Sequence, residues 1–163
     1  LKAPGWSECG VVYDWNGLPI KGRIDRYSQT AGFILDVKKC RVGYGTMELA
    51  RKSIAEYGYM NQMAIYRRGV EVIHGKRPQC LWLFIEDGPP YQFQLVVAHD
   101  WELDHAWERC EAKLRRYQSC CESGEFPGYV TMIHEPGQQP TLAPSHNGGY
   151  PLWMATKVRS GEM

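Results

Sequence analysis

Three strand-like segments joined by two short turns occupy residues 9–40, and this arrangement constrains the fold more than any other feature of the chain. The segments read CGVVYDW (9–15), IKGRIDRY (20–27) and FILDVKKC (33–40), with NGLP and SQTAG between them. Short connections that contain Asn-Gly or glycine are typical of β-hairpins. We therefore predict that the fold begins with a β-meander of three strands.

A long segment at residues 46–68, TMELARKSIAEYGYMNQMAIYRR, carries apolar residues at helical spacing. Thr46 is suited to cap its start, because a threonine hydroxyl accepts a hydrogen bond from the first helical turn. Gly58 lies inside the segment, where glycine costs only about 1 kcal/mol relative to alanine. We therefore predict one continuous helix, which Gly69 ends.

Two apolar runs, CLWLFIE at 80–86 and YQFQLVVA at 91–98, predict two further strands. Asp100 then predicts the start of a second helix, which extends to Gly124. The order β-β-β-α-β-β-α indicates an α/β (α+β) fold, in which helices flank a mixed central β-sheet. From residue 125 the chain is rich in proline and glycine, and we expect an irregular C-terminal segment over 125–163.

The composition is that of one globular domain, and we predict that residues 1–163 form it. Hydrophobic residues make up 44% of the chain, charged residues 23%, and the net charge is +1, which are ordinary values. No apolar run approaches the roughly 18 residues that span a bilayer. Six cysteines without a CxxC pair are expected to be free thiols in a reducing compartment. We therefore expect a cytoplasmic protein with no membrane partner.

Asp36 and Lys38 follow an apolar run and point to the same side of their predicted strand. If the second and third strands pair, Asp25 approaches Asp36, and two such carboxylates repel unless a cation lies between them. Carboxylate oxygens, with the carbonyl of Val37 as a further donor, suit Mg²⁺. Lys38 could orient a water or stabilise negative charge on a phosphodiester. The alternative interpretation is an ion pair on an edge strand, worth about 0–1 kcal/mol.

The predicted helix 46–68 adds a second polar group. Tyr59, Gln62 and Tyr66 are spaced at i, i+3 and i+7, which places them on one helical face. Gln62 and Tyr66 can both donate hydrogen bonds without carrying charge, which suits contact with a phosphate or a sugar. The alternative is an amphipathic helix whose tyrosines only pack against the core.

Basic residues surround the two aspartates. Residues 21–41 contain six lysine and arginine residues against Asp25 and Asp36 alone. A local excess of positive charge fits a site that attracts a polyanion, and it makes Arg23 and Lys39 candidates for contacts with that polyanion. A solvated strand face is the alternative.

Together these motifs resemble the PD-(D/E)XK nuclease superfamily. The motifs are GRID at 22–25, ILDVK at 34–38 and the helix with Tyr59, Gln62 and Tyr66. Within the superfamily they look most like the phage-recombination exonucleases of the RecE and lambda-exonuclease type, and the Q-x-x-x-Y helix is shared with RecB-type nuclease domains. GEFPGY at 124–129 and PLW at 151–153 are similar to the ending of RecE-like domains.

The resemblance implies a restriction-endonuclease-like core that hydrolyses DNA with Mg²⁺ or Mn²⁺. Members of the family degrade one strand of linear double-stranded DNA from the 5′ end. Carried over by position, Asp25 and Asp36 match the metal-binding acids, Lys38 matches the catalytic lysine, and Gln62 and Tyr66 match the motif helix. We therefore expect an exonuclease of phage-type recombination or DNA repair, in the cytosol of a bacterium or of a phage-infected host.

The resemblance also implies partners and leaves alternatives open. Family members often form rings around DNA, so a homo-oligomeric ring and a single-strand annealing protein are the expected partners. RecE-like domains carry an upstream helical segment that contributes one more site residue, and only 24 residues precede Asp25 in this sequence. We expect either an excised core or a substitute, for which Glu8 is the candidate. The alternatives are a restriction-like or nicking endonuclease and a DNA-binding module without turnover.

Overall fold

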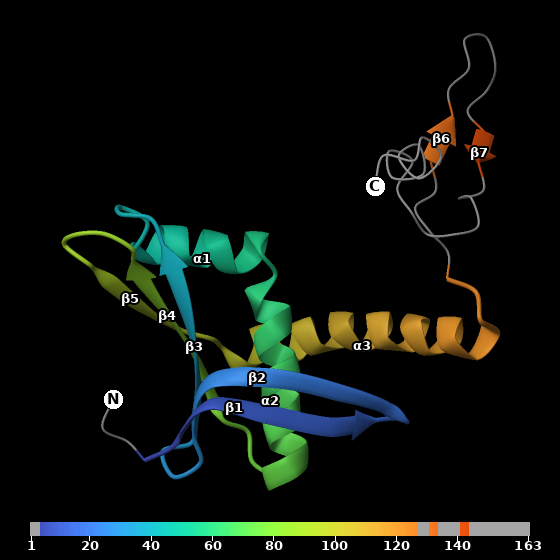
Figure 1. The fold of residues 1–163 in the computed structure, drawn as a ribbon, viewed down its shortest axis with the longest axis horizontal. Coiled ribbons are helices and arrows are strands. Elements are labelled where there is room, and N and C mark those ends of the chain that lie inside the picture. Colours follow the sequence, from blue (N-terminus) through green and yellow to red (C-terminus); the bar gives the residue numbers. More distant parts are fainter. Residues whose placement is uncertain (1–3, 127–130, 134–140, 144–163) are drawn as a thin grey trace, which may run out of the picture. The chain divides into compact units, whose positions relative to one another are not determined.

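The computed structural model describes residues 4–126, 131–133 and 141–143 of the chain. The chain forms two compact units, Leu1–Arg115 and Arg116–Met163. The first unit holds a five-stranded sheet and the helices that pack on it (Figure 1). The second unit holds the end of the last helix and a two-stranded sheet. That residues 1–163 form one domain stays a prediction.

The five-stranded sheet has the order β1-β2-β3-β4-β5. Its strands are β1 (Trp6–Trp15), β2 (Leu18–Ser28), β3 (Phe33–Cys40), β4 (Gln79–Glu86) and β5 (Phe93–Val97). β3 and β4 are parallel, and the other neighbours are antiparallel. The predicted meander and the predicted mixed sheet are therefore confirmed. The predicted strand 91–98 is longer than β5, which leaves out residues 91 and 92, where Tyr91 has a positive φ of 57°, and residue 98.

The β1–β2 turn follows the predicted Asn-Gly chemistry. Trp15 pairs with Leu18, which leaves only Asn16 and Gly17 as the loop. Both have positive φ, 49° and 84°, as a two-residue hairpin turn of type I′ requires.

The predicted single helix over 46–68 is wrong in two respects. The structure has two helices, α1 (Met47–Glu56) and α2 (Tyr59–His74), separated at Gly58, which adopts φ 68° in the left-handed region. Gly69 does not end α2: it lies inside the helix, where an added Cβ would lie 2.7 Å from Val11 Cγ2. Thr46 does cap α1, since its side chain accepts a hydrogen bond from the Leu49 N–H.

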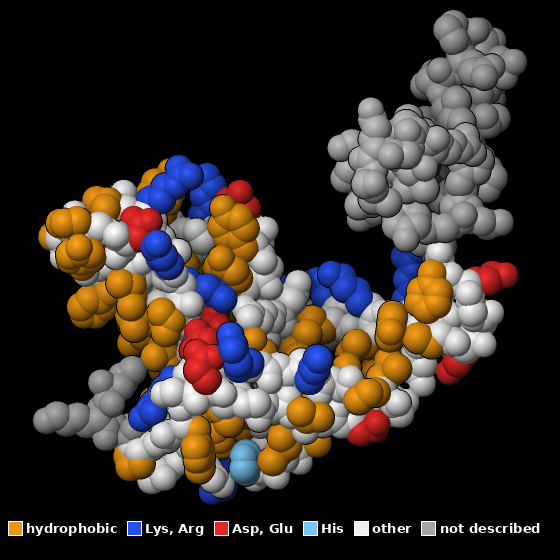
Figure 2. Space-filling model, in the orientation of Figure 1, with side chains coloured by type: hydrophobic (Ala, Val, Ile, Leu, Met, Phe, Trp, Pro, Cys, Tyr) orange, Lys and Arg blue, Asp and Glu red, His pale blue; other side chains and the backbone are white. Residues whose placement is uncertain are grey.

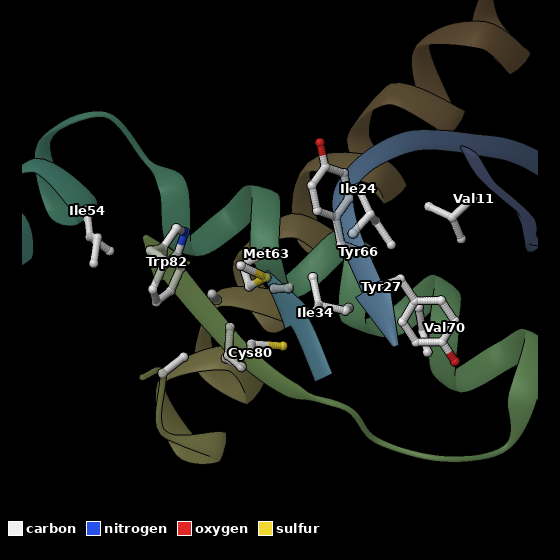
Figure 3. Close-up of a cluster of buried hydrophobic side chains, with 14 of the residues drawn as sticks. Val11, Ile24, Tyr27, Ile34, Ile54, Met63, Tyr66, Val70, Cys80 and Trp82 are labelled. Atoms are coloured by element: carbon white, nitrogen blue, oxygen red, sulfur yellow. The ribbon is translucent and has the colours of Figure 1, made fainter. Parts of the chain in front are cut away.

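The core lies between one face of the sheet and the helices (Figure 3). In β4 the buried residues alternate, and Trp82 and Phe84 join the same cluster as Met63 of α2. Burying an apolar side chain of this size contributes about 1.5–3 kcal/mol. The cluster also includes strand residues Val11, Ile24, Ile34 and Cys80, and helix residues Ile54, Tyr66, Val70 and Leu103.

The last helix and the C-terminal region complete the described chain. Helix α3 spans Asp100–Ser123 and is followed by Gly124, close to the predicted limits. Within the segment predicted to be irregular, β6 (Thr131–Ile133) and β7 (Thr141–Ala143) form an antiparallel pair, so the prediction is wrong for these residues. Residues 127–129 and 151–153 of the two C-terminal motifs lie outside the described residues.

All six cysteines, each within the described part of the chain, are free thiols as predicted. Across residues 4–126, no helix combines the length and the apolar character that crossing a membrane requires.

Candidate active site

The candidate site lies where β2 and β3 separate. Their ladder contains three pairs and stops at Arg26 opposite Leu35; beyond this point β2 pairs only with β1, and β3 only with β4. Asp25 and Asp36 are the next residues on the two strands. The predicted pairing of GRID with ILDVK is therefore only partly correct, because Ile34 and Leu35 join the ladder but no residue of 22–25 does. Asp25 Oδ2 accepts a hydrogen bond of 2.7 Å from the Val37 N–H. The carboxylate thus takes the place of a ladder acceptor at the point where the strands diverge.

Asp36 and Lys38 form a buried ion pair. Asp36 is 3% exposed, and Lys38 Nζ lies 2.7 Å from its Oδ2. Apart from this contact with the ammonium, that Oδ2 has no hydrogen-bond partner among the described residues. Burial raises the pKa of Asp36; the Lys38 ammonium opposes this and the charge of Asp25 adds to it, and the net shift is upward. The carboxylate therefore carries a charge that its surroundings stabilise incompletely.

Helix α2 holds the lysine from the other side. Lys38 Nζ donates a 3.0 Å hydrogen bond to Gln62 Oε1 and lies 4.2 Å from the centre of the Tyr59 ring. Gln62 Nε2 in turn donates to Tyr66 Oη at 2.8 Å. The predicted helical face therefore meets the predicted strand, and three side chains fix the position of the ammonium.

The remaining predicted site residues make other contacts. Glu8 Oε2 pairs with Arg23 Nε at 2.9 Å, and both side chains are more than half exposed. Lys39 Nζ lies 3.8 Å from Asp87 Oδ2. Acidic side chains flanked by lysine and arginine are visible near the divergence of β2 and β3 (Figure 2).

The donor set at the divergence point fits a hard cation. Among the described residues no three His, Cys, Asp or Glu side chains gather into a metal-binding group. Mg²⁺, however, is commonly bound by one or two carboxylates, with waters and substrate phosphates as its other ligands. Asp25, Asp36 and the Val37 carbonyl supply oxygen donors of this kind, and the buried Asp36 Oδ2, which has no hydrogen-bond partner besides its contact with Lys38, is suited to binding such a cation.

Two residues that shape the site or the loop after β3 were not predicted. An added Cβ at Gly22 would lie 2.5 Å from Tyr66 Cε1, so only glycine lets the Tyr66 ring reach its place beside Gln62. Glu86, 3% exposed, accepts hydrogen bonds from Gly43 N–H and Gly45 N–H at 2.8 and 3.3 Å. The only sign of the role of Gly22 in the sequence is its place in the GRID motif. The only sign of the role of Glu86 is that a carboxylate ends an apolar strand.

Comparison with known proteins identifies the family and the fold of the chain. Residues 3–134 match the family model described as a PDDEXK-like domain of unknown function (DUF3799). The fold is similar to the crystal structure of a putative exonuclease from Eubacterium rectale, with a TM-score of 0.62 and 17% sequence identity. That match covers 75% of this chain and 47% of the other, so the chain spans about half the length of this structural neighbour. No curated protein matches the sequence.

The likeness in structure confirms the restriction-endonuclease-like fold, a five-stranded mixed sheet flanked by three helices. The family match covers most of the chain, and it includes the aspartates, the lysine and the α2 side chains described above. The chain therefore belongs to the PDDEXK-like family DUF3799, within the PD-(D/E)XK nuclease superfamily.

Proposed function

We propose that the protein is a metal-dependent nuclease that hydrolyses phosphodiester bonds of DNA. The observation that carries this proposal is the buried Asp36–Lys38 pair, 2.7 Å apart, at the divergence of β2 and β3. A carboxyl whose pKa is raised by burial, beside a specific charged partner, is typical of reaction centres. Membership of a PDDEXK-like family supports the same reaction class.

The roles of the side chains follow from their contacts. Asp25, Asp36 and the Val37 carbonyl would hold Mg²⁺ or Mn²⁺, which supplies positive charge to the phosphate during hydrolysis. Lys38 orients the attacking water or donates to a phosphate oxygen, since its ammonium has three donors. Gln62 holds Lys38, Tyr66 holds Gln62, and the Tyr59 ring covers the ammonium. Arg23 and Lys39, both exposed, contribute to DNA attraction, and Glu8 is a further acid beside Arg23.

The specific activity that we propose is that of a 5′ to 3′ exonuclease on linear double-stranded DNA. Such an enzyme would act in phage-type recombination or DNA repair in the cytoplasm, with a single-strand annealing protein as a partner and a homo-oligomeric ring as the working form. These details derive from the motifs GRID, ILDVK and Q-x-x-x-Y, whose order and spacing resemble the RecE and lambda-exonuclease type.

The test is incubation of the protein with 5′-phosphorylated linear duplex DNA in Mg²⁺, in Mn²⁺ and in chelator. We expect metal-dependent degradation by the wild type and almost none by Lys38→Ala or Asp36→Asn. Lys76→Ala, an exposed lysine in the α2–β4 loop, is the matched control and should keep full activity. Equal degradation by wild type and Lys38→Ala would show that the assigned centre is wrong.

Covalently closed circular DNA separates the exonuclease from an endonuclease, because only an endonuclease can cut it. Linear duplexes labelled at the 5′ or the 3′ end then report polarity. Binding without hydrolysis in any metal would identify a DNA-binding module.

A further inference from the structure

A cleft of about 610 Å³ lies beside the candidate active site, between the end of β3, helix α1 and the turn after β4. Its size is within the range of small-molecule and ligand sites, about 300–1,000 Å³. The side chains that line it combine cations with aromatic rings. They include Lys39, Arg41, Lys52, Tyr44, Tyr57 and Tyr59.

The cleft and the candidate site share a wall. The Tyr59 ring lines the cleft and also lies 4.2 Å from Lys38 Nζ. Lys39, the next residue on β3, lines the cleft as well. A ligand in the cleft would therefore lie next to the lysine of the candidate centre.

The β3–α1 loop that forms one side of the cleft is held in place. Glu86 accepts hydrogen bonds from Gly43 N–H and Gly45 N–H, and the Tyr44 N–H donates to the Arg41 carbonyl at 3.0 Å. The Glu86 side chain is buried, and an added Cβ at Gly45 would lie 3.1 Å from its Oε1. A buried carboxylate thus fixes the part of the loop that carries Tyr44.

The rings in this cleft are available for stacking. Tyr44 is 49% exposed and Tyr57 is 64% exposed, so each has surface that the protein does not cover. Tyr57 also lies against Tyr59, with ring centres 5.6 Å apart. Three cations against Glu56 and Asp87 leave a positive balance for a phosphate backbone.

We infer that this cleft binds an unpaired, single-stranded segment of DNA next to the scissile phosphate. Bases inside a duplex stack on one another, whereas an unpaired base can place its face on a tyrosine ring. Cations that follow the backbone and aromatic rings that take the bases are the usual combination for single strands. This inference rests on the proposed function, since it places the segment at the nuclease centre, but its test measures binding alone.

The test uses fluorescence anisotropy of a labelled oligothymidylate and of a blunt duplex, both in chelator so that no hydrolysis occurs. The double variant Tyr44→Ala/Tyr57→Ala should weaken single-strand binding by roughly 5- to 150-fold for each base that stacks on one of these rings, which corresponds to about 1–3 kcal/mol per stacked base. Tyr44→Phe/Tyr57→Phe keeps the rings and should keep the affinity. Phe93→Ala removes an exposed ring, 70% exposed, from outside the cleft and is the matched control.

Oligonucleotides that contain 2-aminopurine add a readout for stacking. We expect its fluorescence to be quenched on binding to wild type and to the double Phe variant, and not on binding to the double Ala variant. Equal single-strand affinity for wild type and the double Ala variant overturns the inference, and so does an equal loss in Phe93→Ala.

These outcomes are separate from those of the proposed function. Tyrosine-dependent binding in a protein that never hydrolyses DNA supports the cleft and refutes the nuclease. If hydrolysis depends on Lys38 but single-strand binding does not depend on Tyr44 and Tyr57, the nuclease is supported and the role of the cleft is refuted.

Discussion

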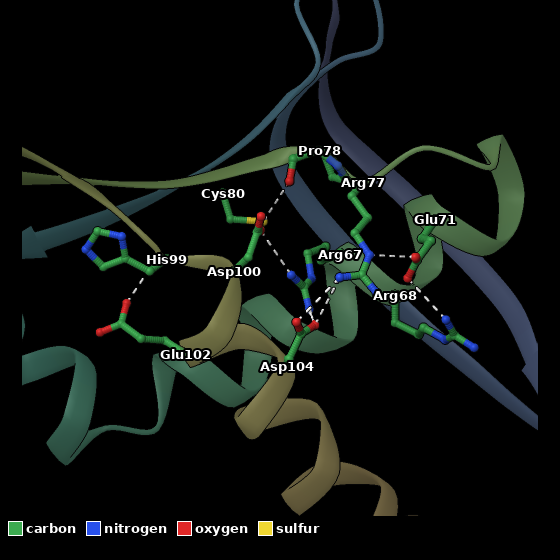
Figure 4. Close-up of polar contacts among 10 residues, drawn as sticks. All are labelled: Arg67, Arg68, Glu71, Arg77, Pro78, Cys80, His99, Asp100, Glu102 and Asp104. Atoms are coloured by element: carbon green, nitrogen blue, oxygen red, sulfur yellow. Dashed lines mark hydrogen bonds and ion pairs between the residues drawn. The ribbon is translucent and has the colours of Figure 1, made fainter.

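Two clusters of buried charge involve helix α2, and they differ in how fully the charges are satisfied. Arg67 and Asp36 are equally buried, each 3% exposed. Arg67 Nη1 lies 3.3 Å from Asp100 Oδ1, and its Nη2 contacts Asp104 Oδ1 (Figure 4). Among the described residues Asp36 forms an ion pair with Lys38 alone, and its Oδ2 has no hydrogen-bond partner besides that contact.

The same difference appears in the direction of the pKa shifts. Burial alone would raise the pKa of Asp104, but Arg67 and Arg77 outweigh it and lower that pKa. Burial would also raise the pKa of Glu71, and Arg77 and Arg68 lower it. For Asp36 burial prevails over Lys38, and the pKa is raised.

The comparison distinguishes charged residues that stabilise the fold from charged residues that are suited to catalysis. The Arg67 cluster joins α2 to the start of α3 with carboxylates that favour the folded state as anions. In the Asp36 cluster the anion is incompletely stabilised and therefore destabilises the folded state, as is common for carboxylates at functional sites.

The largest effect that we predict comes from Asp36→Asn. Hydrolysis should fall by roughly 10²–10³-fold or more, since removing one electrostatic group from a reaction centre has effects of this size. The free energy of unfolding should stay the same or increase, because the lost charge is one whose pKa is raised. Initial rates on linear duplex and urea denaturation measure the two quantities. Asp104→Asn is the control, and we expect it to keep full hydrolysis and to have a lower free energy of unfolding. An Asp36→Asn variant that is stable and still hydrolyses DNA at the wild-type rate would contradict the proposed difference between the clusters.

The second effect is a loss of stability in Arg67→Met. Breaking a buried pair typically costs about 3–5 kcal/mol; we expect roughly 2–3 kcal/mol here, because the carboxylates left behind are partly exposed to water. Urea denaturation measures the loss, and hydrolysis by the folded protein should be unchanged. Arg51→Met, whose 3.9 Å pair with Glu102 is half exposed on the arginine side, should cost less than about 1 kcal/mol. Similar losses in the two variants would contradict a special role for Arg67.

The strands and the site face were predictable because they depend on local pattern. The alternation in β3 placed Asp36 and Lys38 on one face, and the Asn-Gly turn fixed the β1–β2 register. The face of Gln62 and Tyr66 followed from helical spacing, and both side chains contact the lysine or each other.

The parts that were missed depend on tertiary contacts. Glycine costs too little in a helix to mark Gly58 as a break, and the break needs its positive φ. The frequency of glycine at helix ends predicts an end at Gly69, whereas this glycine lies inside α2 and allows the close approach of Val11 and Tyr13. No local pattern indicates that Glu86 accepts hydrogen bonds from a loop more than forty residues earlier in the chain.

The third effect uses two glycines that allow close packing, Gly22 beside Tyr66 and Gly69 beside Val11. Gly22→Ala would bring a Cβ to 2.5 Å from the Tyr66 ring, and Gly69→Ala would bring one to 2.7 Å from Val11. Each should destabilise the fold by about 1–3 kcal/mol through overpacking, less for Gly69→Ala because alanine favours a helix by about 1 kcal/mol. Only Gly22→Ala should also slow hydrolysis, since it displaces the tyrosine that holds Gln62.

Matched measurements of unfolding free energy and of hydrolysis rate test this pair of glycines. Gly10→Ala is the control, because its added Cβ would meet nothing within 4 Å. An equal loss of hydrolysis in Gly22→Ala and Gly69→Ala would show that the Tyr66 position is not what matters.

The smallest effect is a pH dependence of opposite sign in the two clusters. The unfolded pKa of an aspartate is about 3.9, and that of folded Asp36 is higher. Below about pH 3.9 both states hold the proton and the anion costs nothing; as pH rises through the folded pKa, wild type loses stability relative to Asp36→Asn. The advantage of Asp36→Asn should therefore grow toward neutral pH.

For Asp104 the folded pKa is lowered, so its anion contributes stability above about pH 3.9 that is lost as pH falls through the folded pKa. Asp104→Asn should therefore be at its greatest disadvantage at neutral pH and approach wild type in acid. Urea denaturation of wild type and both variants between about pH 3 and pH 7, at constant ionic strength, measures these differences. For each variant, the difference in unfolding free energy from wild type is followed as pH rises. If both differences changed in the same direction, the two carboxylates would favour the folded state in the same protonation state. The distinction between a stabilising cluster and a reactive one would then be wrong.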